Sequence, residues 1–110
     1  MYQGTTPSVV YEVKNYDLTS ASIFVSFKKG NEVITKTQPD VAASYSSASK
    51  ISAVVCNLTQ EETLKMKAGG WITQIRFIYA SGQAFATNEK ELEVKRVLYP
   101  EVISYGGDGS

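Results

Sequence analysis

Between Trp71 and Tyr79 the chain alternates two sets of side chains, and this alternation limits the possible folds more than any other feature of the sequence. The first set is large or β-branched and comprises Trp71, Thr73, Ile75, Phe77 and Tyr79. Successive side chains of a β-strand point to opposite faces, so a period of two predicts a long strand with one aromatic face. We expect this strand to lie at the centre of the core.

Shorter stretches with the same period precede this strand. The alternation over residues 8–14 predicts one strand, and that of Ile23, Val25 and Phe27 predicts a second. Gly30 and Asn31 adopt positive φ most easily, so they predict a tight hairpin onto a third strand at residues 33–37.

Two further regions lie between this hairpin and the aromatic strand. The Ser/Ala-rich stretch 42–49 receives no definite structure from its pattern and is typical of a flexible or edge segment. Ile51, Ala53 and Val55 share one face of the next stretch. Because Val54 and Cys56 occupy the other face, we expect a strand that is covered on both sides.

Residues 59–70 predict a helix of about two turns. Thr59 and Glu62 have the spacing of a capping box, in which each side chain accepts a hydrogen bond from the other residue's backbone N–H. We expect Leu64 to pack on the sheets, Glu61 to pair with Lys65, and Ala68-Gly69-Gly70 to end the helix. Such a short helix predicts a connector from one sheet to the other.

The C-terminal part predicts two more strands. Residues 84–87 return as a hairpin partner of the aromatic strand, and the last strand covers residues 90–99. In the last strand we expect an inward set and a solvent-facing set. The inward set is Leu92, Val94, Arg96 and Leu98, and the solvent-facing set is Glu91, Glu93 and Lys95.

Together these segments predict an all-β chain, specifically an immunoglobulin-like antiparallel β-sandwich with one short connecting helix. We expect one domain over residues 1–105 and a flexible Gly-rich tail at residues 106–110.

The composition argues against catalysis. The chain has no histidine and one cysteine, Cys56, which removes the commonest general base and leaves too few ligands for a zinc or thiolate-cluster site. The carboxylate pairs Glu61/Glu62 and Glu91/Glu93 fit a helix start and a solvated strand face better than a glycosidase site. We therefore predict no enzymatic activity, no catalytic or metal residues and no cofactor.

Eleven basic residues balance eleven acidic ones without a long block of either sign. This balance predicts neither a nucleic-acid nor a membrane partner. The partners we expect are proteins, recognised at the two ends of the chain, where aromatic and apolar side chains have little interior left to cover them. The candidate interface residues are Tyr2, Thr5, Pro7, Tyr99, Val102, Ile103 and Tyr105.

Five stretches resemble one known group of proteins. They are Tyr2-Gln3-Gly4-Thr5-Thr6-Pro7, Leu58-Thr59-Gln60-Glu61-Glu62-Thr63-Leu64-Lys65, Gln74-Ile75-Arg76, Gly82-Gln83-Ala84-Phe85-Ala86-Thr87 and Val94-Lys95-Arg96-Val97-Leu98. Their order and spacing are similar to those of small tail or baseplate proteins of phages and prophages of Gram-positive bacteria, akin to the N-terminal domain of the baseplate upper protein.

The resemblance implies a structural or adaptor protein of a phage tail tip or baseplate. It would be made in the cytoplasm of the bacterial host and located in the virion, with other tail or baseplate proteins, or a second copy of itself, as partners. The alternative is a carbohydrate-binding or host-adhesion module, because sandwiches with exposed aromatic side chains commonly bind glycans. That alternative requires a planar cluster drawn from the tyrosines expected at the surface, Tyr2, Tyr16, Tyr99 and Tyr105.

Overall fold

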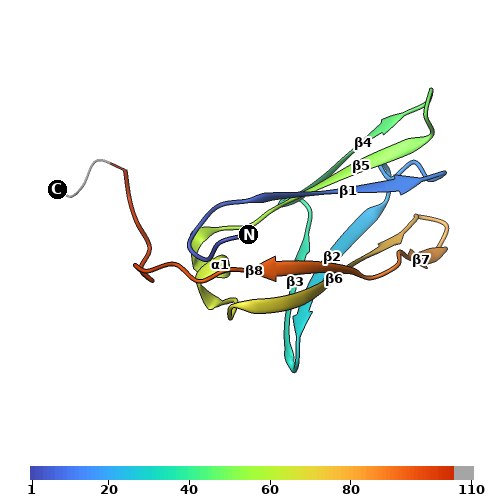
Figure 1. Cartoon of the computed structure of the whole chain (residues 1–110). Helices are drawn as coiled ribbons and strands as arrows, with labels where there is room; N and C mark the ends of the chain where they lie inside the picture. The colour runs from blue at the N-terminus through green and yellow to red at the C-terminus, as the bar shows by residue number, and fades with distance from the viewer. Residues whose placement is uncertain (106–110) are drawn as a thin grey trace.

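The computed structural model describes residues 1–105 and shows a mainly-β protein with two antiparallel sheets and one short helix (Figure 1). Its elements are β1 (Ser8–Lys14), β2 (Ser22–Lys29), β3 (Glu32–Thr37), β4 (Val41–Ser46), β5 (Ile51–Asn57), α1 (Gln60–Lys65), β6 (Gly69–Ile78), β7 (Ala84–Ala86) and β8 (Lys90–Val94). The all-β class and the short helix are thus confirmed. The tail expected at residues 106–110 lies outside the described residues.

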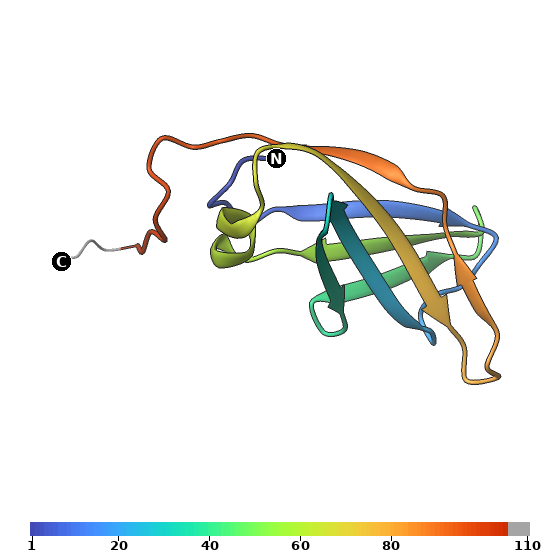
Figure 2. The ribbon, with the colours of Figure 1, turned by 90° about the horizontal axis from the view of Figure 1, so that it is seen from below.

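The smaller sheet has three strands in the order β1-β5-β4, and the larger has five. In the larger sheet β3, β2 and β6 are neighbours, while β7 and β8 share the remaining edge of β6. β7 lies opposite residues 76–78 of β6 and β8 opposite residues 69–73. Figure 2 shows β1 and β8 on the same side of the sandwich, where neither sheet has a further strand.

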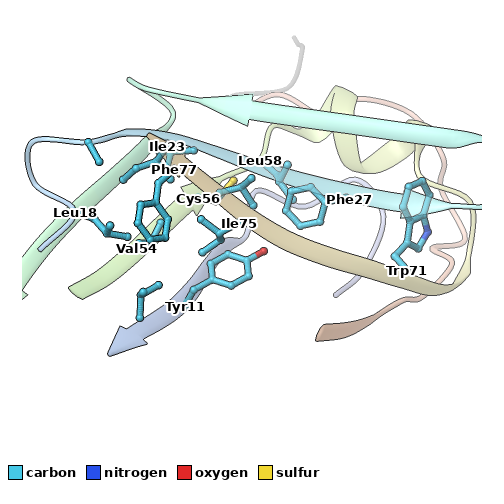
Figure 3. Packing of buried hydrophobic residues seen from close by; sticks show 14 of the residues in the cluster. Tyr11, Leu18, Ile23, Phe27, Val54, Cys56, Leu58, Trp71, Ile75 and Phe77 are labelled. Atoms are coloured by element: carbon cyan, nitrogen blue, oxygen red, sulfur yellow. The ribbon is translucent and has the colours of Figure 1, made fainter. Parts of the chain in front are cut away.

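The core fills the space between the two sheets (Figure 3). Trp71, Ile75 and Phe77 of β6 are buried together with Thr73, as the alternation predicts. Each polar group among them has a partner: the Trp71 indole N–H donates to the carbonyl of Lys67 at 2.8 Å, and the hydroxyls of Tyr11 and Thr73 lie 2.6 Å apart. Because buried donors and acceptors must be paired, these bonds allow an indole and a phenol to sit in the core.

The predicted hairpin between β2 and β3 is confirmed. Gly30 and Asn31 form its two-residue loop, and Lys29 pairs with Glu32 across it. Gly30 has φ +60°. Positive φ at the first central position suits a type II′ turn, whose twist matches that of the flanking strands.

Residues 42–46 of the Ser/Ala-rich stretch belong to β4, an edge strand that, among the described residues, pairs with β5 alone, and residues 47–49 lie in the turn that follows. In β5 the fully buried face consists of Ser52, Val54 and Cys56, whereas Ile51, Ala53 and Val55 are half-buried. Ser52 tolerates burial because its hydroxyl donates to the Tyr16 carbonyl at 2.6 Å and accepts from the Leu18 N–H at 3.0 Å.

The capping box at the start of α1 is confirmed. The Glu62 N–H donates to the Thr59 hydroxyl at 3.2 Å, and the Thr59 N–H donates to the Glu62 carboxylate at 2.8 Å. α1 connects β5 in one sheet to β6 in the other, as expected for a connector.

Three details of the helix differ from expectation. Thr63 and Met66, not Leu64, are the fully buried side chains here, because the inward face of so short a helix is set by the chain that packs on it. Glu61 and Lys65 do not form an ion pair within the described chain. Gly69 and Gly70 do not end the helix, which stops at Lys65; they begin β6.

The last strand is shorter than predicted. β8 ends at Val94, which lies opposite Gly69, the first residue of β6. Beyond that point β6 offers no backbone to pair with, so the expectation that Arg96 and Leu98 face the core is wrong, and both are exposed. Leu92 and Val94 do face inward and Glu91 and Glu93 outward, as predicted.

Candidate interaction surfaces

The N-terminal arm, residues 1–7, is bound to its own domain. The Gln3 N–H donates to the Lys95 carbonyl at 2.9 Å and the Lys95 N–H to the Met1 carbonyl at 2.7 Å, which forms a parallel bridge between Tyr2 and Lys95. The Lys95 ammonium also lies 5.6 Å from the centre of the Tyr2 ring. The arm therefore pairs with the chain directly after β8, at Lys95, and covers the edge of the larger sheet at that point.

The rest of the arm packs on the helix end of the sandwich. The Thr63 hydroxyl donates to the Thr5 carbonyl at 2.8 Å, and the Leu58 N–H donates to the Pro7 carbonyl at 3.1 Å. Of the three candidate interface residues here, Tyr2 and Thr5 keep exposed side chains and Pro7 is half-buried. The arm is therefore a fixed surface of this domain.

The C-terminal segment, residues 99–105, is the most exposed apolar part of the described chain. Tyr99, Val102, Ile103 and Tyr105 are each at least 50% exposed. No strand includes this segment, and it leaves the domain at the end that carries α1 (Figures 1 and 2). As predicted, the core does not cover these four side chains.

One side chain holds the C-terminal segment to the domain. The Gln60 amide donates to the Ile103 carbonyl at 2.9 Å, and the Ile103 N–H donates to the Gln60 amide oxygen at 2.8 Å. The side chain thus satisfies the backbone of Ile103 as a neighbouring strand would. Both bonds are exposed to solvent, so they orient the segment without burying it.

Apolar side chains also gather on the outer face of the larger sheet. Phe24, Val33, Ile72 and Ile78 are each at least 39% exposed. This exposed apolar face is not among the surfaces predicted from the sequence. The sequence feature that indicates this face is the pair of isoleucines, Ile72 and Ile78, which lie on the side of β6 opposite Trp71.

A groove opens between the two sheets on the side where β1 and β8 lie. It encloses about 260 Å³ and is lined by Tyr11, Glu12, Val13, Lys14, Thr73, Ile75, Thr87, Asn88 and Lys90. The groove exists because the edge of β6 is uncovered between β7 and β8. There Thr87 alone continues the ladder: its N–H donates to the Ile75 carbonyl at 2.9 Å and its hydroxyl accepts from the Ile75 N–H at 3.1 Å.

The most deeply placed charges form a cluster between β3 and α1. The Lys36 ammonium, only 8% exposed, donates to both Glu62 carboxylate oxygens at 2.7 and 2.6 Å and lies 3.4 Å from Asp40. Desolvation favours the neutral forms of Lys36 and Glu62, but their mutual hydrogen bonds and charges outweigh it. The pKa of Lys36 is therefore raised and that of Glu62 lowered.

This cluster has the character of a structural ion pair. Cys56, which lies close enough to feel its charges, is fully buried, and burial raises the pKa of its thiol to about 11. A thiol with so high a pKa is a poor nucleophile at neutral pH. Within residues 1–105 no group of three or more histidine, cysteine or carboxylate side chains is placed to hold a metal ion.

The tyrosines expected at the surface occupy separate places. Tyr16 packs against Phe77 and Phe85, with ring centres 5.3 and 4.9 Å apart, whereas Tyr2 lies beside Lys95 at the helix end. Tyr99 and Tyr105 belong to the C-terminal segment. Because Tyr16 belongs to the aromatic group with Phe77 and Phe85, the four tyrosines do not all share one surface.

Comparison of the chain with protein-family models and with curated proteins finds no match. In the described part of the chain, no helix has the length and apolar character needed to cross a bilayer.

Proposed function

We propose that the chain is a non-enzymatic structural or adaptor protein of a phage tail tip or baseplate, joining virion components through its surface and termini. The observation that carries the proposal is the C-terminal segment, whose four large apolar side chains the domain leaves uncovered. Exposed apolar groups concentrated on one extended segment are typical of a sequence that orders fully only on a partner. The sequence resemblance to baseplate proteins supplies the kind of partner.

We also propose that the two sheets form an immunoglobulin-like sandwich, and the strand order supports this assignment. In an immunoglobulin constant domain one sheet has the order A-B-E-D and the other contains C, F and G. Here β1, β5 and β4 fit positions B, E and D, while β2, β6 and the β7–β8 edge fit C, F and G. In this assignment α1 occupies the E–F connection and β3 is an added strand beside C, while none of the described residues forms a strand at position A next to β1.

The N-terminal arm is bound to its own domain, unlike the C-terminal segment, and therefore contributes differently to partner binding. Its backbone is already bonded to Lys95, Leu58 and Thr63, so it offers a fixed surface that includes the exposed Tyr2 ring. The C-terminal segment, in contrast, belongs to no strand and is held to the domain by the Gln60 side chain at Ile103, so it offers exposed apolar side chains on a loosely attached backbone. We therefore assign the principal contact to residues 99–105.

Deletion of residues 100–110 tests this function. None of the buried core residues lies in the deleted stretch, so the sandwich should stay folded, with the fluorescence of buried Trp71 unchanged. Incorporation of the protein into phage particles should be lost. A matched control replaces the exposed Lys50 in the turn after β4 with alanine, which should leave incorporation unchanged. Normal incorporation of the folded, truncated protein would show that this interface is wrong.

A further inference from the structure

The β1 strand has a free edge. It pairs with β5 on one side and, among the described residues, with no strand on the other. A strand with one neighbour leaves half of its backbone N–H and C=O groups pointing outward, ready to bond to an added strand. The groove between the sheets lies directly beside this edge, since Tyr11, Val13 and Lys14 of β1 form one of its walls.

The length and sequence of the C-terminal segment suit an added β-strand. Residues 99–105 match β1 in length, with seven residues each. In an extended conformation Tyr99, Glu101, Ile103 and Tyr105 share one side. Pro100 lacks an N–H and therefore fits an edge strand but not a central one.

The charges of the two surfaces are complementary. Two lysines, Lys14 and Lys90, and one carboxylate, Glu12, line the groove, so basic side chains outnumber acidic ones there. Neither lysine lies within 4 Å of a carboxylate in the described chain. The Lys90 ammonium lies 5.9 Å from the centre of the Tyr11 ring, at the wall of the groove. The segment carries one charge, Glu101, on the same side as Ile103. Glu101 placed in the groove would therefore meet an unpaired ammonium while Ile103 reaches the apolar wall of Val13 and Ile75.

The segment and the groove of one chain face different directions. The segment leaves at the α1 end, where Gln60 holds Ile103, while β1 runs from that end toward the opposite one (Figures 1 and 2). A second copy can instead present its segment to the free edge without disturbing either domain. The contact joins two different surfaces, so it is heterologous and propagates from copy to copy into a ring or a filament.

We propose that the C-terminal segment of one copy adds as a strand to the free edge of β1 in the next copy and places Glu101 beside Lys90 in the groove. The inference rests on the proposed function and names the partner as a second copy of this chain. In the immunoglobulin-like assignment, the added strand fills position A.

Charge exchange in the full chain tests this contact by sedimentation velocity over a range of concentrations. The unmodified protein should show association that increases with concentration. Lys90→Glu and Glu101→Lys should each lower the association constant about fivefold, as expected for loss of a partly exposed ion pair. The double variant should restore association, because it exchanges the two charges. Glu93→Lys, which changes an exposed carboxylate on the outer face of β8, is the matched control and should have no effect.

A protein that sediments as a monomer at every concentration overturns the proposal. The same conclusion follows if Glu93→Lys weakens association as much as Glu101→Lys, or if the double variant is weaker than both single variants. Particle incorporation separates this proposal from the function on which it rests. A monomeric protein that still requires residues 100–110 for incorporation refutes the β1 contact alone, whereas one that is incorporated without them refutes the proposed interface as well.

Discussion

Replacement of Glu62 by glutamine removes one charge from the cluster between β3 and α1 while keeping the size of the side chain. The amide oxygen can still accept the Thr59 N–H, so the capping box survives. What is lost is the charge partner of Lys36, an ammonium that is only 8% exposed.

The expected cost lies between two limits. Removal of one partner from a fully buried ion pair costs about 3 to 5 kcal/mol, and from an exposed pair about 0 to 1 kcal/mol. The Glu62 side chain is 27% exposed, and Asp40 at 3.4 Å remains as a second carboxylate for Lys36. We therefore expect Glu62→Gln to lower the free energy of unfolding by about 2 kcal/mol. Glu62→Ala should cost about 1 kcal/mol more, because it also removes half of the capping box.

The pH dependence has a definite sign. Because the pKa of folded Glu62 lies below its ordinary value of 4.5, its ion pair stabilises the fold above that pH and is lost as the pH falls through the folded pKa. The pKa of folded Lys36 lies above 10.5, so its contribution is complete below that pH and is lost as the pH rises through the folded value. Glu62→Gln should therefore flatten the acid side of the stability profile.

Urea unfolding followed by circular dichroism measures these differences, and Glu61→Gln is the matched control. Glu61 is exposed and forms no ion pair in the described chain, so its replacement should change the free energy of unfolding by less than about 0.5 kcal/mol. Equal effects of the two substitutions at neutral pH would refute the assignment of Glu62 and Lys36 as a structural pair.

Three other substitutions or reactions test the core and the helix start. Trp71→Ala should cost about 3 to 5 kcal/mol, since the side chain is fully buried; unchanged melting, or native emission like that of free tryptophan, would contradict the core assignment. Thr59→Ala should cost about 1 kcal/mol and Thr59→Asp little, because either oxygen accepts the Glu62 N–H, and equal losses in urea unfolding would argue against the cap. The Cys56 thiol should react slowly with a thiol reagent in the native protein and quickly in denaturant, and rapid native labelling would place it at the surface.

Local patterns predicted the parts of the fold that local chemistry controls. The alternation from Trp71 to Tyr79 predicted β6 and its buried face, and the Thr59/Glu62 spacing predicted the capping box. The Gly30-Asn31 pair predicted the turn between β2 and β3. In each case the residues that interact are neighbours in sequence or share one strand, so the pattern carries the whole signal.

The errors arose where a distant partner decides the outcome. The alternation of β8 continues to Leu98, but pairing stops at Val94 because β6 begins at the opposite residue. On the buried face of β5, the Ser52 hydroxyl donates to the Tyr16 carbonyl and accepts from the Leu18 N–H, and both partners lie more than 30 positions away in the sequence.

Distant partners also explain what the sequence analysis missed in the candidate surfaces. The ion pair of Lys36 with Glu62 joins residues 26 positions apart. The clamp between Gln60 and Ile103 spans 43 positions. Periodic patterns within one segment cannot predict pairs that are so far apart in the sequence. The exposure of the C-terminal segment was predictable, because its apolar residues follow the last strand and exceed what the core can cover.

Quantitative mass spectrometry of phage particles purified by density gradient tests most directly the proposal that this protein is a component of phage particles. We expect the protein to copurify with the tail proteins in a constant ratio across the particle peak. Complete and infectious particles that lack the protein would contradict its proposed place in the virion.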